Sequence, residues 1–149
     1  MPRIERTAEV EWEGNLARGR GFISAGTGAF NGLPYTLAAR VGAPEGMTSP
    51  EELLAAAHGG CFATSLAGEL SNRGLPPERL EIACRILMDE VPDQGHQIVG
   101  SRVTARAVVP GADEATFATV VEAADAGCPF SALLKRSGAT VEIDAMLAR

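Results

Sequence analysis

One stretch of the 149-residue chain constrains its fold more than any other: Leu53 to Gly68 carries no charged side chain and is bounded by Glu52 and Glu69. Most of its residues are small, and residues 55–61 read Ala-Ala-Ala-His-Gly-Gly-Cys. A helix that is uncharged on every face is typically a buried helix, and small side chains let a neighbouring backbone approach closely. The stretch therefore predicts a buried central helix.

The residues on either side mark the ends of this helix. Ser49 is a good N-cap, Pro50 suits the first helical position, and Glu52 follows the cap at the spacing of a capping box. Gly74, just before a Pro-Pro pair, is a typical helix stop. We expect the helix to continue to residue 72 or 73.

Alternating apolar and polar residues predict strands before and after the helix. In the first third of the chain the strand candidates are Thr7 to Trp12, Gly21 to Ala25 and Pro34 to Val41. After the helix, a hairpin is predicted from residues 80–89 and 99–109, a second helix from Asp113 to Gly127, a short helical turn from Cys128 to Lys135, and a last strand over 141–147. This order is an α+β pattern, which we assign to a single domain over residues 1–149.

Composition and charge narrow the functional classes. With 46% hydrophobic and 21% charged residues, the chain has a globular composition. Its formal net charge of −6 and the absence of a Lys/Arg run argue against a nucleic-acid partner. The first residues lack the apolar run of a signal peptide, and the uncharged stretch is shorter than the roughly 20 residues of a membrane helix. We expect a cytoplasmic protein with no membrane partner, in a compartment where structural disulfides are rare.

The three cysteines are therefore candidate core residues, metal ligands or reactive thiols. Cys84 occupies an apolar position in an alternating strand, and we interpret it as a core residue. Cys128 lies between Gly127 and Pro129 near the start of a helical turn, where free N–H groups favour an anionic sulfur. Cys61 lies within the buried helix, where desolvation is expected to raise its pKa.

Cys61 needs a nearby cation to act as a nucleophile. Increasing the ionisation of a thiol a hundredfold takes about 2.7 kcal/mol, which a guanidinium about 4 Å away can supply in a partly screened site. Arg40, at the end of the predicted third strand, is the best candidate, although the pattern fits an ordinary solvated arginine equally well. Glu51 and Glu52 lie in the first helical turn, where one can cap the helix and the other can hold an arginine.

Distinctive motifs occur in order along the chain: Val10 to Gly14 with Arg18 to Gly21, Thr48 to Leu53, Ala57 to Phe62, and Ala126 to Pro129. Together they resemble the OsmC/Ohr family of hydroperoxide-reducing proteins over almost the whole chain. The segment that contains Trp12 is more similar to the OsmC branch of the family. Gly59-Gly60 departs from the Ala-rich sequence that is typical before the cysteine.

The resemblance implies an intertwined homodimer in which antiparallel sheets wrap around long central helices. It also implies that Cys61 is the peroxidatic thiol, that Cys128 resolves it as a disulfide, that Arg40 activates the thiolate and that Glu51 orients the arginine. The implied substrates are organic hydroperoxides, with hydrogen peroxide as a further candidate, and the implied reductants are dithiols such as lipoyl groups. We expect a role in stress defence, with no cofactor and no metal ion.

Three alternative functions remain open from the residues alone. Cys61 and His58 share a helix face and could form a Cys–His hydrolase pair. Cys61, Cys128 and His58 also offer zinc-type ligands, although without the usual ligand spacing. The third alternative is a module that binds a small molecule or lipid and has no use for its thiols.

Overall fold

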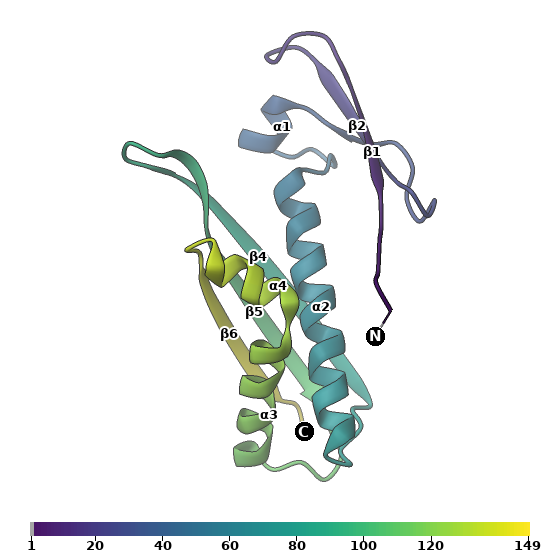
Figure 1. Cartoon of the computed structure of the whole chain (residues 1–149), viewed down its shortest axis with the longest axis vertical. Helices are drawn as coiled ribbons and strands as arrows, with labels where there is room; N and C mark the ends of the chain where they lie inside the picture. The colour runs from purple at the N-terminus through teal and green to yellow at the C-terminus, as the bar shows by residue number, and fades with distance from the viewer. Residues whose placement is uncertain (1) are drawn as a thin grey trace. The chain divides into compact units, whose positions relative to one another are not determined.

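The computed structural model describes residues 2–149, which divide into two compact units, with the boundary in the chain between Pro50 and Glu51. Each unit contains one three-stranded sheet (Figure 1). Most of the helical residues belong to the second unit. The predicted α+β class is confirmed, and the assignment of residues 1–149 to one domain stays a prediction.

The first unit is built on an antiparallel sheet with the order β1-β2-β3. Its strands are β1 (Ala8–Glu13), β2 (Arg20–Ala25) and β3 (Leu33–Tyr35). The first two strands agree with the prediction to within one residue at each end. The third is much shorter than predicted, because the chain leaves the sheet after Tyr35.

A short helix, α1 (Leu37–Val41), replaces the second half of the predicted third strand. Its N-cap is Thr36, whose hydroxyl accepts a hydrogen bond from the Ala39 N–H at 3.1 Å. Leu, Ala, Ala and Arg then follow, all of them strong helix formers. Local capping and propensity therefore override the strand that was predicted for Pro34 to Val41, and they place Arg40 in a helix.

The long helix α2 spans Pro50–Asn72, as predicted. It ends in a Schellman motif, in which Gly74 has a φ of 70° and the Leu75 N–H donates to the Leu70 carbonyl at 3.0 Å. Its burial differs from the prediction, because only one face is covered in the chain. The buried residues are His58, Gly59, Phe62, Leu66 and Leu70, whereas Ala56, Gly60 and Thr64 are exposed.

The second sheet has the order β4-β5-β6 and consists of β4 (Arg79–Val91), β5 (Gly95–Val108) and β6 (Thr140–Leu147). The β4–β5 hairpin is antiparallel, as predicted. β6 runs parallel to β5, which is an exception to the expected antiparallel arrangement. The two helices that join these strands, α3 (Glu114–Gly127) and α4 (Pro129–Arg136), form a crossover that returns the chain to the starting end of β5.

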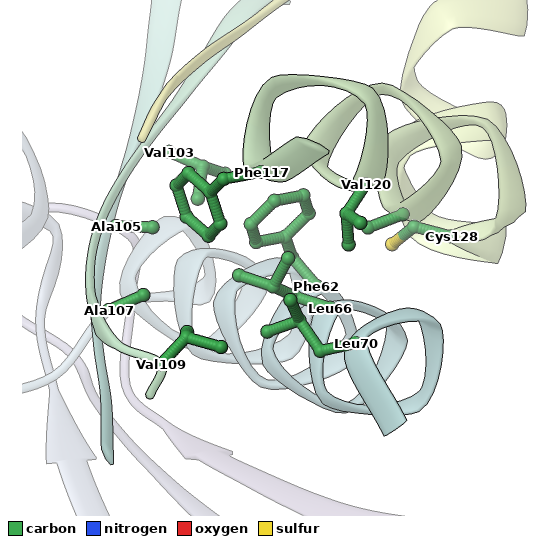
Figure 2. Close-up of a cluster of buried hydrophobic side chains, with 11 residues drawn as sticks. Phe62, Leu66, Leu70, Val103, Ala105, Ala107, Val109, Phe117, Val120 and Cys128 are labelled. Carbon is green, nitrogen blue, oxygen red and sulfur yellow. The ribbon is translucent and has the colours of Figure 1, made fainter. Parts of the chain in front are cut away.

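The core of the second unit lies between this sheet and the three helices, which cover the same face of it (Figure 1). Its members alternate along β5 and follow helical spacing on α2 and α3. They are Phe62, Leu66, Leu70, Val103, Ala105, Ala107, Val109, Phe117, Val120, Ala124 and Cys128 (Figure 2). The opposite face of the sheet is polar, with Arg102 and Glu142 in an ion pair at 2.6 Å.

Within residues 2–149, no single helix is long and apolar enough to cross a membrane. Taken together, α3 and α4, which are bent at 65° to each other, have the length and apolar composition of a membrane-spanning segment.

Candidate active site

Cys128 lies at the junction of two helices. It is the C-cap of α3 and the N-cap of α4, and Pro129 takes the first position of α4. The two helices meet at 65°, so the chain bends sharply at this cysteine. Its side chain is fully buried, and Figure 2 shows its sulfur among the apolar side chains of the core. The junction therefore holds one thiol at a fixed point inside the second unit.

The fold brings Cys61 of α2 to this thiol. The two Sγ atoms are 3.3 Å apart although the residues are 67 positions apart in the sequence. Both cysteines are free thiols, Cys61 being partly buried. A disulfide requires a sulfur–sulfur distance of about 2.05 Å, so the sulfurs have to approach each other by only about 1.2 Å. The arrangement suits reversible formation of a Cys61–Cys128 disulfide.

The surroundings of Cys61 within the second unit disfavour its ionisation. Burial raises the pKa of the Cys61 thiol above its ordinary value, and the hydrogen bond with Cys128 raises it further. The backbone N–H of Phe130 lowers this pKa to a smaller extent. These groups therefore favour the protonated thiol, and a positive charge near the sulfur would be needed to offset them.

Next to the sulfur pair, a buried polar cluster is built around His58. The His58 Nδ1 atom lies 2.6 Å from Ser101 Oγ on β5, and Nε2 lies 2.8 Å from Ser131 Oγ on α4. None of the three side chains is more than 2% exposed. Burial lowers the pKa of His58, which favours the neutral imidazole. Since both ring nitrogens are engaged by serine hydroxyls, the arrangement speaks against a Cys61–His58 hydrolase pair.

Cys84 faces this cluster from β4. Its Sγ atom lies 3.4 Å from Ser101 Oγ and 3.8 Å from His58 Nδ1. It packs at the margin of the core, as its alternating strand position predicted. The strand comes so close to α2 that a Cβ added to Gly59 would meet the Cys84 Cβ at 3.3 Å. The close approach anticipated from the Gly-Gly pair is therefore found at Gly59, where it is made by β4.

Two further polar links hold α3 to its neighbours. The Ser65 hydroxyl on α2 donates to the Ala124 carbonyl at 2.7 Å. The Lys135 ammonium on α4 contacts the Asp125 carboxylate at 2.5 Å. The first link ties α3 to α2, whereas the second joins α3 to α4 across Cys128 and helps to fix the bend between them.

Arg40 lies on α1 in the first unit, where it lines a pocket of about 310 Å³. The pocket is otherwise mainly aromatic and aliphatic, and its remaining residues are Trp12, Leu16, Tyr35, Thr36 and Leu37. The Trp12 and Tyr35 rings pack with centroids 5.5 Å apart. An arginine in the lining of a mainly apolar pocket suits a ligand that has a polar end and a hydrocarbon body.

Glu51 lies in the first turn of α2, as predicted. A carboxylate at this position complements the partial positive charge of the helix N-terminus. The roles assigned to Arg40 and Glu51 stay predictions.

Among residues 2–149, no group of three or more His, Cys, Asp and Glu side chains is arranged to hold a metal ion. The zinc-site alternative named Cys61, Cys128 and His58. In the structure, the two sulfurs contact each other and both His58 nitrogens contact serines.

Ser101 and Ser131 were not predicted as partners of His58. Ser101 was detectable in principle, because it stands at an inward position of β5, two residues before Val103 and four before Ala105. A hydroxyl at such a position needs a polar partner on a facing element. The pairing with a helix residue and with Ser131 depends on tertiary packing, which no local pattern contains.

Two free thiols at hydrogen-bonding distance in an α+β fold are typical of proteins that cycle between a dithiol and a disulfide. Residues 43–144 match the family described as OsmC-like protein. The chain is also 36% identical over 132 residues to a protein named Peroxiredoxin OsmC from Escherichia coli strain K12, a match that covers 89% of this chain and 91% of that protein. The chain therefore belongs to the OsmC-like protein family, as its sequence motifs predicted.

Solved structures share the fold. An organic hydroperoxide resistance protein OsmC from Legionella pneumophila superposes with a TM-score of 0.70 at 18% identity, covering 99% of this chain and 100% of that one. The organic hydroperoxide resistance protein OhrB of Bacillus subtilis gives a TM-score of 0.66 at 23% identity, covering 95% and 98% of the two chains. At these identities the likeness supports the fold alone.

Proposed function

We propose that this protein is a thiol-dependent peroxidase that reduces organic hydroperoxides to alcohols. Cys61 is the thiol that attacks the peroxide, and Cys128 resolves the product. The observation that carries the proposal is the 3.3 Å separation of the two free sulfurs. The relative named Peroxiredoxin OsmC supports the same activity.

In the first step, the Cys61 thiolate attacks the distal oxygen of the hydroperoxide. A sulfur–oxygen bond forms, the oxygen–oxygen bond breaks, and the alkoxide leaves and takes a proton to become the alcohol. Because burial raises the pKa of Cys61, this step needs a positive charge near the sulfur. In the proposal Arg40 supplies that charge and also stabilises the departing oxygen, while Glu51 orients the guanidinium.

The apolar pocket beside Arg40 supports an organic rather than a purely inorganic peroxide. Trp12, Tyr35 and Leu37 offer hydrocarbon surface to the body of the substrate. The peroxide group is polar, and Arg40 is the charged residue of the pocket lining that can bind it. Hydrogen peroxide is a smaller substrate that would leave the apolar surface unused, so we expect it to be the poorer one.

In the second step, Cys128 converts the oxidised sulfur into a disulfide, with loss of water. An external dithiol, such as a lipoyl group, then restores the two thiols by exchange. Cys61 is the partly exposed sulfur of the pair, so the exchange starts there. We place this cycle in the cytoplasm as part of a defence against peroxide stress.

The proposal includes a homodimer. α2 leaves Ala56 and Gly60 exposed on a face of small residues. Between this face and β4 lies an open groove of about 440 Å³ whose lining includes Ile82 and Cys84. A second copy of α2 is a suitable occupant, because small side chains let helices pack closely. Sedimentation of the purified protein at the mass of a dimer would support this part of the proposal, and a monomer would contradict it.

The decisive experiment adds one equivalent of cumene hydroperoxide to the reduced protein and maps the product by mass spectrometry. We expect cumyl alcohol and a Cys61–Cys128 disulfide, with Cys84 still a free thiol. A Cys84 crosslink would overturn the residue assignment. Absence of both alcohol and disulfide would overturn the proposed function itself.

A further inference from the structure

Side chains of α2 contact the start of α4 at two places, which lie one helical turn apart. Cys61 contacts Cys128 through their sulfurs at 3.3 Å. His58, three residues before Cys61, contacts Ser131, three residues after Cys128, at 2.8 Å between Nε2 and Oγ. Since residues three apart lie on the same face of a helix, the two contacts are successive links between the same pair of helices.

The His58 link is fixed at its other end. The second ring nitrogen, Nδ1, contacts Ser101 Oγ at 2.6 Å, and Ser101 belongs to the central strand β5. The imidazole is therefore held between the sheet and α4 and has no freedom to turn. All three side chains are buried, so water does not compete for these hydrogen bonds.

The sulfur link is the weaker of the two and is the one that must change. Each catalytic cycle turns a contact of 3.3 Å into a bond of about 2.05 Å and back again. Cys128 makes no side-chain capping bond to α4, so its own helix does not fix its side chain. The Phe130 N–H of α4 also contacts the Cys61 sulfur, so that contact changes with the reaction too, whereas the His58–Ser131 link involves neither sulfur.

We propose that His58 and Ser131 are positioning residues, which hold α4 so that Cys128 captures the oxidised form of Cys61 before a competing nucleophile or a second peroxide reaches it. This inference rests on the proposed peroxidase function. The hydroperoxide first oxidises Cys61 to its sulfenic acid. The Cys128 sulfur then attacks the Cys61 sulfur, the sulfur–sulfur bond forms, the sulfur–oxygen bond breaks, and the hydroxyl leaves as water with the proton that Cys128 gives up.

The test measures how the sulfenic acid is partitioned. Reduced protein receives one equivalent of cumene hydroperoxide in the presence of excess dimedone, which traps sulfenic acids. Mass spectrometry then gives the ratio of the dimedone adduct on Cys61 to the Cys61–Cys128 disulfide. This ratio does not depend on how fast the sulfenic acid forms, and it reports only on the capture step.

Ser131→Ala removes the hydroxyl that His58 contacts on α4. We expect the ratio of adduct to disulfide to rise about tenfold, because a misplacement of about 1 Å can slow a positioned reaction by up to a hundredfold. Ser101→Ala leaves the α4 contact in place but frees the other side of the imidazole. We expect it to raise the ratio in the same direction by a smaller factor.

The matched control is Ser65→Ala. Ser65 also lies on α2 and uses its hydroxyl to hold a neighbouring helix, but its partner is the Ala124 carbonyl of α3. We expect this variant to keep the wild-type ratio while losing comparable thermal stability. An equal rise in Ser65→Ala would mean that general loosening, and not the His58 link, changes the ratio, and it would overturn the inference.

An unchanged ratio in Ser131→Ala would also overturn it. If Ser131→Ala does not fold, Ser101→Ala decides the question by the same readout. The wild-type protein distinguishes failure of the proposed function from failure of this inference. If the wild type forms neither adduct nor disulfide, the proposed function is overturned. If the wild type reacts normally and the variants give the same ratio, only the role of His58 and Ser131 is overturned.

Discussion

The second unit holds two sulfur sites that differ in what surrounds the sulfur. At the first, Cys61 on α2 meets the sulfur of Cys128 at the bend between α3 and α4. At the second, Cys84 on β4 meets a hydroxyl and an imidazole, from Ser101 and His58. Both Cys61 and Cys84 are partly buried, so their exposure to reagents does not distinguish them.

The difference shows that the partner of a thiol, more than its exposure, decides what its oxidation leads to. An oxidised Cys61 has a second thiol within about 1.2 Å of bonding distance and can be captured inside the molecule. An oxidised Cys84 would face groups that donate or accept hydrogen bonds but form no sulfur–sulfur bond. The two sites therefore predict different responses to loss of the thiol, which should abolish turnover at Cys61 and leave it unchanged at Cys84.

The largest expected effect is at Cys61. Cys61→Ser replaces the attacking sulfur by a hydroxyl that stays protonated at neutral pH, so we expect peroxidase turnover to fall by at least about a thousandfold. A coupled assay with cumene hydroperoxide and a lipoyl reductant measures this loss. Turnover that survives the substitution would mean that another sulfur is the nucleophile, and the contrast between the two sites would be reversed.

The next largest effect is expected at Arg40. Arg40→Met keeps an unbranched, flexible stem but removes the guanidinium and its charge, and we expect turnover to fall about a hundredfold, as for other groups that stabilise developing charge. Arg18→Met, which changes an exposed arginine of the same unit, is the matched control and is expected to behave like the wild type.

The pH dependence sharpens this prediction. Only the thiolate attacks the peroxide, so the rate of the first step rises with pH until the pH exceeds the pKa of Cys61. Burial raises that pKa, and loss of the guanidinium leaves this effect uncompensated. The rate of Arg40→Met should therefore reach its plateau at a higher pH than that of the wild type, which stopped-flow measurements across the pH range can test. A plateau at the same pH would remove Arg40 from the activation of the thiol.

Cys128→Ser should have a smaller effect on the first turnover than on later ones. The sulfenic acid still forms on Cys61, but no internal thiol captures it, so we expect a normal first turnover followed by steady-state turnover lowered by about tenfold or more. Quenched samples should contain Cys61 oxidised to sulfinic acid and no internal disulfide. A new disulfide between Cys61 and Cys84 would show that the two sulfur sites communicate.

The sequence was sufficient for the long helix, the hairpin and the second helix, because each carries a strong local signal. Ser49 and Pro50 mark one end of α2, Gly74 marks the other, and Asp113 caps α3 through the Thr116 N–H at 2.7 Å. The local signal also explains the main error. The stretch after Tyr35 was interpreted as a strand, but the Thr36 cap makes it the helix that carries Arg40.

The sulfur pair was predicted from the sequence, whereas the partners of His58 were not. Cys61 and Cys128 were paired through the family resemblance, since nothing local relates residues 67 positions apart. The partners of His58 were missed, because Ser131 reaches it only after α4 has packed against α2. Contacts that depend on how whole elements pack cannot be predicted from the residues that neighbour them in the sequence.

The smallest effect is expected at Cys84, where a substitution tests whether the second sulfur site takes part in the redox cycle. Cys84→Ala removes a sulfur whose contacts are Ser101 and His58, so we expect unchanged turnover and a free energy of unfolding lowered by less than about 1 kcal/mol. Urea denaturation measures the stability, and the coupled peroxidase assay measures the turnover. The His58–Ser101 hydrogen bond does not involve this sulfur, so the cluster should persist. A loss of turnover as large as that of Cys128→Ser would mean that Cys84 takes part in the redox cycle, and the two sites would then have to be treated as one.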